Sequence, residues 1–186
     1  MKISKFKWGI VVMILFLSCG VSKNPPSEAE LATLNELVNK RDFTIESDWA
    51  YPQATMAMQQ VMNSGLMLPG DNAANISLVG NYNFLKIKGD SITSHLPYFG
   101  ERQMQVDYGG MDSAIQFKGL MENYKVEKNK NHGYNISFSA TSNRERFNVL
   151  IAVSPSLKTN MVLNGVSRFP IRYSGTASLI SEKNKE

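Results

Sequence analysis

The chain contains one cysteine, Cys19, and two histidines among its 186 residues. One cysteine excludes an internal disulfide and a multi-cysteine metal site. His132 lies in a polar turn, where we expect it to face solvent. His95 follows Ser94, but neighbouring strand residues point to opposite faces, so these two do not form a catalytic pair. A phosphate-binding loop, a dinucleotide fingerprint and a nucleophile elbow are also missing. We therefore expect no catalytic activity.

No apolar run has the roughly 18–20 residues that a membrane-spanning helix needs. The longest run at the N-terminus, residues 8–17, has ten residues and follows Lys2, Lys5 and Lys7. A positive segment before a short apolar run is typical of a signal peptide.

The end of this segment, Ser18-Cys19-Gly20, resembles a bacterial lipobox, although Phe16 and Leu17 depart from its tightest form. We predict that residues 1–18 are a lipoprotein signal peptide and that Cys19 is lipidated. The expected acyl chains include palmitate. Each buried CH₂ adds about 0.8 kcal/mol, and two or more acyl chains anchor a protein stably. The predicted membrane contact is therefore the lipid at Cys19.

Basic residues exceed acidic ones by little. The chain has 20 Lys and Arg against 16 Asp and Glu, and three of the lysines lie in residues 1–18, which contain no acid. Beyond residue 18 the balance is 20 − 3 = 17 against 16, or +1. Nucleic-acid binding depends on a clear basic surplus, so we do not predict it.

A single domain is predicted over residues 27–181, between a linker at 19–26 and a polar tail at 182–186. Ser27 and Glu30 form the pattern of a capping box, which predicts a helix over about residues 28–40. One helical face carries the apolar residues Leu31, Leu34, Leu37 and Val38.

Apolar and polar residues alternate through much of the remaining chain, most clearly over residues 134–140 and 147–153. Alternation joined by tight turns indicates antiparallel strands with one buried face. We predict a mostly β fold of about nine or ten short strands, as curved antiparallel sheets in a sandwich or an open barrel, with one short N-terminal helix. Gly89-Asp90 and Asn164-Gly165 are predicted hairpin turns, and the step from Phe84 to Leu85 a bulge.

Four methionines, Met56, Met58, Met62 and Met67, lie close together. Thioether sulfurs are soft ligands that suit Cu(I), but neither His nor Cys lies nearby to complete a site. We interpret them as adaptable side chains that fill the core, and we predict no metal and no cofactor.

The least generic stretch runs from Ser94 to Gly100 and is followed by Tyr108-Gly109-Gly110. Pro97 ends or edges a strand, and a positive φ at Gly100 would let the chain turn. The rings either cap the open end of a β core or line a groove for a ligand. The candidate binding residues are Leu96, Pro97, Tyr98, Phe99, Gly100, Tyr108, Gly109 and Gly110.

Three carboxylates flank this stretch: Glu101, Asp107 and Asp112. Two carboxylates about 5–10 Å apart could act as a hydrolytic pair. Surface loops often carry such acids, so hydrolysis stays an alternative.

The order of these motifs resembles a known family. It runs from the lipobox and helix through Leu96–Gly100 and Tyr108–Gly110 to Ile115-x-Phe117-x-Gly119 and Pro170-Ile171-x-Tyr173-Ser174-Gly175. Together these resemble "domain of unknown function 4251", a family of small lipoproteins of Bacteroidetes-type bacteria. The resemblance implies a mostly β cell-envelope domain and brings no established activity or catalytic residues. In such bacteria acidic residues after the lipidated cysteine direct surface export. Residues 20–23 lack them, which implies an outer-membrane protein facing the periplasm.

We therefore expect a lipid-anchored, non-catalytic binding or accessory module that uses the surface around residues 96–110. Its expected partner is an envelope protein, a peptide or a small apolar ligand. A purely structural lipoprotein and a hydrolase using Glu101, Asp107 or Asp112 are the alternatives.

Overall fold

The computed structural model describes residues 25–64, 72, 74–103, 114–142 and 145–180. The described chain is mostly β, with an N-terminal helix and antiparallel pairing between its strands, as predicted. The helices are α2 (Glu28–Lys40) and α3 (Met56–Asn63). The strands are β1 (Asp42–Pro52), β2 (Ile76–Ser77), β3 (Phe84–Lys88), β4 (Ser91–His95), β5 (Lys118–Leu120), β6 (Glu122–Lys128), β7 (Tyr134–Ser142), β8 (Glu145–Val153), β9 (Lys158–Gly165) and β10 (Ile171–Leu179).

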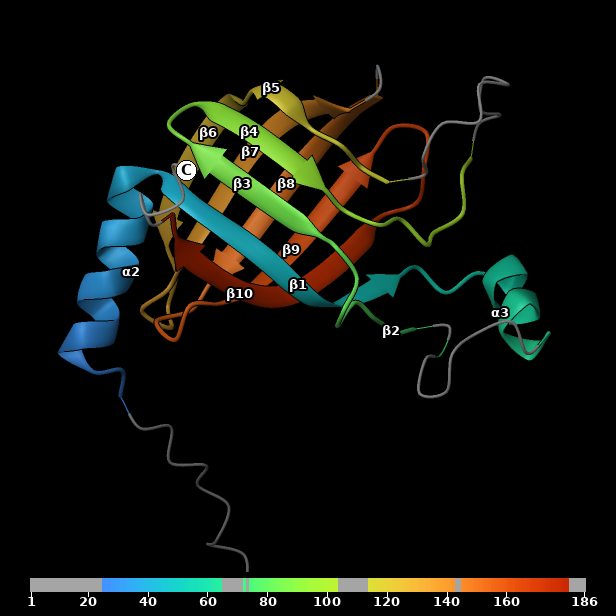
Figure 1. Cartoon of the computed structure of the whole chain (residues 1–186), viewed down its shortest axis with the longest axis horizontal. Coiled ribbons are helices and arrows are strands. Elements are labelled where there is room, and N and C mark those ends of the chain that lie inside the picture. The colour runs from blue at the N-terminus through green and yellow to red at the C-terminus, as the bar shows by residue number, and fades with distance from the viewer. Residues whose placement is uncertain (1–24, 65–71, 73, 104–113, 143–144, 181–186) are drawn as a thin grey trace, which may run out of the picture.

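These strands form one curved sheet that nearly closes into a barrel (Figure 1). The order is β5-β4-β3-β1-β10-β9-β8-β7-β6, and β2 pairs with β1. Only Met121 separates β5 from β6, so one segment pairs with β4 at its start and with β7 at its end. Near closure leaves few unpaired backbone groups, which protects the sheet against edge-to-edge association. Of the two predicted arrangements, a sandwich or an open barrel, the structure is the barrel-like one.

Alternate residues of each strand fill the interior. In β8 the inward side chains are Phe147, Val149, Ile151 and Val153, all at most 2% exposed. Burying one such side chain contributes roughly 1.5–3 kcal/mol, so this core is the main source of stability.

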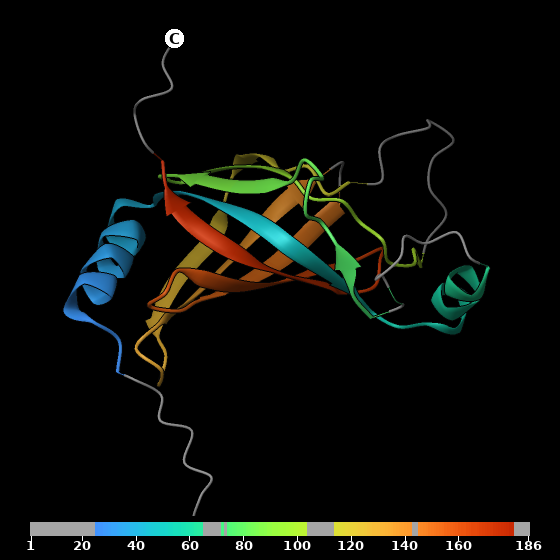
Figure 2. The same ribbon diagram turned by 60° about the horizontal axis from the view of Figure 1, so that its bottom comes forward.

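Helix α2 covers one end of the barrel, where Leu34, Leu37 and Val38 are buried (Figure 2). The predicted capping box is present: Glu30 N–H donates to Ser27 Oγ over 3.2 Å, and Ser27 N–H donates to Glu30 Oε2 over 2.8 Å. Within the described ranges, no helix has the length and apolar character that crossing a bilayer requires.

Three local predictions were wrong. Residues 56–63 of the methionine-rich segment form helix α3, with Met56 83% exposed, so this residue does not fill a core, and Met67 lies outside the described residues. Asn164-Gly165 does not turn: it continues β9, with Asn164 opposite Asn148, and the turn falls at residues 166–170. No bulge separates Phe84 from Leu85. A bulge lies instead in β1, between Ser47 and Trp49.

This bulge is packed against Gly175 of β10. A Cβ at Gly175 would clash with the Glu46 carbonyl oxygen and the Ser47 Cα atom. A glycine inside a strand therefore marks the place where β1 bends over its neighbour and the sheet curves.

Candidate functional site

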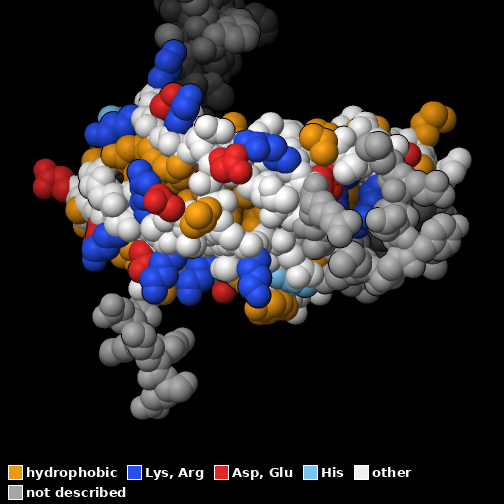
Figure 3. Space-filling model, turned by 90° about the horizontal axis from the view of Figure 1, so that it is seen from above, with side chains coloured by type: hydrophobic (Ala, Val, Ile, Leu, Met, Phe, Trp, Pro, Cys, Tyr) orange, Lys and Arg blue, Asp and Glu red, His pale blue; other side chains and the backbone are white. Residues whose placement is uncertain are grey.

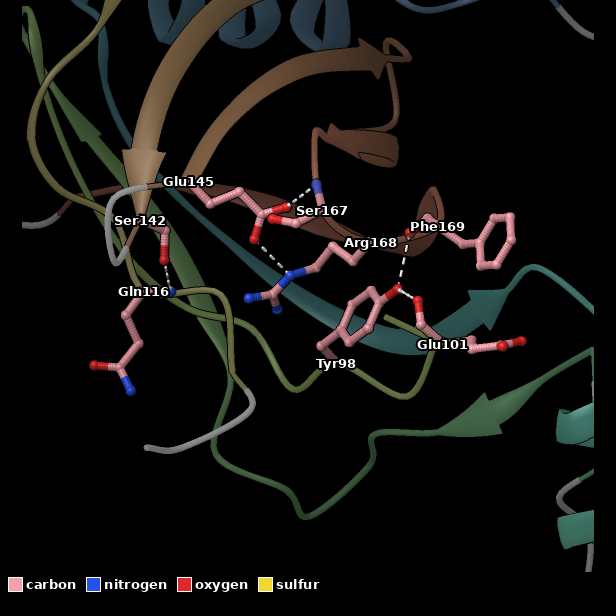
Figure 4. A network of polar contacts seen from close by, with 8 residues as sticks. All are labelled: Tyr98, Glu101, Gln116, Ser142, Glu145, Ser167, Arg168 and Phe169. Carbon is pink, nitrogen blue, oxygen red and sulfur yellow. Dashed lines mark hydrogen bonds and ion pairs between the residues drawn. The ribbon is translucent and has the colours of Figure 1, made fainter. Parts of the chain in front are cut away.

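The predicted central stretch lies at the end of the barrel opposite α2. At the α2 end, Gly89 N–H donates to the Arg41 carbonyl oxygen, and the Tyr134 hydroxyl donates to Asn35 Oδ1. Strands β4 and β7 therefore start beside the helix and carry the chain to the far end. There the segment 96–103 meets the loop 166–170 (Figure 4).

Leu96 and Tyr98 belong to the barrel rather than to its surface. Leu96 is 0% exposed and exchanges two backbone hydrogen bonds with Ile115. Tyr98 is 6% exposed, and its hydroxyl lies 2.8 Å from the Glu101 carbonyl oxygen and 2.9 Å from that of Phe169. The single hydroxyl proton is shared between these two carbonyl oxygens. Burial raises the pKa of Tyr98 to about 12, so this donor stays protonated at neutral pH.

The neighbours of Tyr98 are more accessible. Pro97, Phe99 and Gly100 are half-buried, and the Pro97 carbonyl oxygen accepts a 2.8 Å bond from the Tyr173 hydroxyl. Gly100 has no positive φ, contrary to the prediction. It is needed for space, because a Cβ there would clash with the Tyr98 hydroxyl.

A buried ion pair beneath Tyr98 was not predicted. Arg168 Nε donates to Glu145 Oε2 over 2.8 Å, and the two side chains are 5% and 7% exposed. Ser167 N–H donates to the other carboxylate oxygen over 2.9 Å. The Arg168 guanidinium lies 4.8 Å from the centre of the Tyr98 ring and 5.4 Å from that of Phe147.

Two backbone hydrogen bonds join the same two loops. Phe169 N–H donates to the Glu101 carbonyl oxygen over 3.1 Å, and Gln103 N–H donates to that of Ser167 over 2.9 Å. The ion pair, the Tyr98 hydroxyl and the backbone hydrogen bonds together hold residues 96–103 against residues 166–170. This arrangement supplies structural support, since both carboxylate oxygens of Glu145 accept bonds within the protein.

The remaining predicted site residues are separated or lie outside the described residues. Glu101 is exposed, and only its backbone oxygen joins the network around Tyr98. Ser94 Oγ is bonded to the backbone of Ile115 and Phe117. Among the described residues, no three His, Cys, Asp or Glu side chains cluster as a metal site. Outside the described residues lie Cys19, Asp107, Tyr108, Gly109, Gly110 and Asp112.

A signal for the ion pair is present in the sequence. Counting back by twos from Val153 through Phe147 reaches Glu145, which therefore occupies an inward position of β8. A carboxylate in a core position requires a partner, because burying an unpaired charge is costly.

Comparisons with known proteins agree with the fold. The family model described as "Domain of unknown function (DUF4251)" matches residues 26–177. A crystal structure of a DUF4251 family protein from Bacteroides eggerthii DSM 20697 superposes with a TM-score of 0.53 at 12% identity, covering 81% of this chain and 88% of that one. At this identity the likeness shows the fold alone. No curated protein matches the chain.

Proposed function

We propose that this chain, which belongs to the DUF4251 family, is a lipid-anchored domain of the cell envelope that binds a partner without catalysing a reaction. The family has no assigned activity, so the proposal depends on the motifs of the sequence and on the geometry of the two barrel ends.

The observation that carries the proposal is the separation of these ends. Ser27, the N-cap of α2, follows the predicted lipidation site Cys19 by 27 − 19 = 8 residues. Eight residues span at most about 28 Å when fully extended, so the barrel is held close to the bilayer. The tether joins the barrel at the α2 end, whereas the stretch around Tyr98 lies at the opposite end. We place the protein at the outer membrane, facing the periplasm.

The proposed binding surface is the outer side of the loops at that opposite end. Pro97 and Phe99 are half-buried there, beside the buried and hydrogen-bonded Tyr98. Side chains held on a rigid base lose little conformational entropy on binding, which favours affinity. Their apolar character suits an envelope protein, a peptide or a small apolar ligand.

The anchor is tested with Cys19→Ala. We expect this variant to leave the membrane fraction and appear in the soluble periplasmic fraction. Wild-type protein isolated from cells should carry acyl chains, as intact-mass spectrometry would show. A variant that stays in the membrane fraction would contradict lipid anchoring.

The binding surface is tested with Phe99→Ser in affinity capture from envelope extracts. Leu120→Ser is the matched control, because Leu120 is 70% exposed and lies near the α2 end. We expect Phe99→Ser alone to lose the captured partner. Because Phe99 is half-buried and packs against the core, thermal unfolding of the variant must show that it is still folded at the assay temperature. Capture by both variants would contradict the surface at Phe99, and no capture by the wild-type protein would favour the structural alternative. Hydrolysis of an envelope substrate by purified protein would favour the hydrolase.

A further inference from the structure

The outer wall of the barrel contains a cleft. It lies over β6, β7, β8 and β9 and has a volume of about 310 Å³. Ser137 and Ser139 form its floor, because these short side chains lie on the central strand β7 between longer ones. Leu150 faces Ser137 from β8, and Lys125 faces it from β6. Ser139 points outward yet is 7% exposed, because longer side chains such as Asn148 surround it.

Carboxamides line the walls in a row fixed by the strand register. Ser139 stands opposite Asn148, and Asn148 stands opposite Asn164. Ser139 Oγ donates to Asn148 Oδ1 over 2.9 Å, which orients the carboxamide and directs its amide nitrogen away from Ser139.

The third carboxamide, Asn123, is held at the rim by unusual backbone geometry. It has a φ of 55° and lies where the β6 register shifts between Glu122 and Lys125. A bulge re-aims a side chain, and a non-glycine residue in the left-handed region is strained unless its surroundings hold it.

The lining excludes most ligand classes. None of the described residues that line the cleft is Asp or Glu, which disfavours a metal cation. Strands β7 and β8 are paired on both sides, so they offer no free edge to a peptide strand. Lys125 is the single cation of the lining, too few for nucleic acid. Phe138 and Val149 face the core, so Leu150 is the outward apolar contact.

We propose that this cleft binds a carbohydrate, with Lys125 placed to receive an acidic substituent on the sugar. A carboxamide both donates and accepts hydrogen bonds, as a sugar hydroxyl does, so three carboxamides and two serines match neighbouring hydroxyls. Leu150 offers the apolar contact for a ring face. The volume lies at the lower end of the range for small-molecule sites.

The test is an NMR titration of the full-length ¹⁵N-labelled protein with tetragalacturonate, and with neutral cellotetraose in parallel. We expect the side-chain amide signals of Asn123, Asn148 and Asn164 to shift together and saturate. Asn164→Ala should weaken binding about 3- to 10-fold, the effect of one lost hydrogen bond. Asn160→Ala is the matched control, because Asn160 is also exposed on β9 but lies outside the cleft.

Lys125→Gln separates the two parts of the proposal. We expect it to remove the preference for tetragalacturonate and leave cellotetraose binding unchanged. The proposal is overturned if neither sugar shifts the three asparagine signals at millimolar concentration. It is also overturned if Asn160→Ala weakens binding as much as Asn164→Ala. Neither result depends on the anchor or on Phe99.

Discussion

Removing Arg168 from the buried ion pair should destabilise the barrel more than any exposed charge would. Arg168→Met keeps an apolar stem of similar length but takes away the charged partner of the Glu145 carboxylate, which is 7% exposed and keeps the hydrogen bond from the Ser167 N–H. Breaking a buried pair in this way typically costs about 3–5 kcal/mol. Since small domains are stable by roughly 5–15 kcal/mol, this would be a large fraction of the whole.

An exposed ion pair of the same length provides the control. Arg146 Nη2 lies 2.8 Å from Glu122 Oε2, the same distance as in the buried pair, but these side chains are 49% and 59% exposed. Exposed pairs contribute about 0–1 kcal/mol. Arg146→Met should therefore change the free energy of unfolding little, and burial is the variable that differs.

The assay is urea unfolding followed by circular dichroism. With a denaturant slope of about 2 kcal/mol per molar, a loss of 4 kcal/mol lowers the midpoint by about 2 M. Adding Glu145→Gln to Arg168→Met removes the unpaired negative charge at position 145 and keeps an acceptor for the Ser167 N–H. This double variant should recover to within about 1–2 kcal/mol of wild type. Equal losses for Arg168→Met and Arg146→Met, or a double variant weaker than the single one, would refute the reasoning.

Three further predictions concern single positions. Tyr98→Phe should lower the free energy of unfolding by about 1–2 kcal/mol, because the carbonyl oxygens of Glu101 and Phe169 lose the hydroxyl donor that they share. In wild type, the raised pKa of Tyr98 means that its contribution is complete below pH 10 and is lost as the pH rises towards 12, which an absorbance titration of tyrosine ionisation would follow. Gly175→Ala should lower the melting temperature sharply, because the new Cβ meets the β1 backbone, whereas Gly119→Ala, with open space around it, should not. Ser27→Ala should reduce stability by about 1 kcal/mol through loss of the capping box, measured by thermal unfolding.

Local patterns predicted the elements of this fold well. The capping box of Ser27 and Glu30 identified α2, and alternation over residues 147–153 identified β8. Both signals act within a few residues, so a single sequence contains them. Whether the strands form one nearly closed sheet or two packed sheets depends on contacts between distant segments. No local pattern contains that information.

The ion pair shows the same limit at the candidate site. Glu145 continues the inward period of β8, but its partner is 23 residues away along the chain. Because we predicted the turn at Asn164-Gly165, we did not predict that residues 166–170 form the loop that carries Arg168. Asn and Gly favour turns locally, yet here pairing with β8 extends β9 through both residues. Tertiary pairing thus prevailed over turn preference.

The connections between strands differ in length between the two barrel ends. In an antiparallel sheet, successive connections alternate between the ends. At the α2 end they are short, at residues 89–90, 129–133 and 154–157. At the opposite end, the connections from β7 to β8 and from β9 to β10 are also short, but β1 and β3 are joined through residues 53–83, and β4 and β5 through residues 96–117. Both of these longer ranges include residues outside the described ones. Long connections in compact domains commonly carry function, because a rigid scaffold can hold varied loops. The long connections lie at the barrel end opposite α2, which would face away from the membrane if the proposed tether is correct.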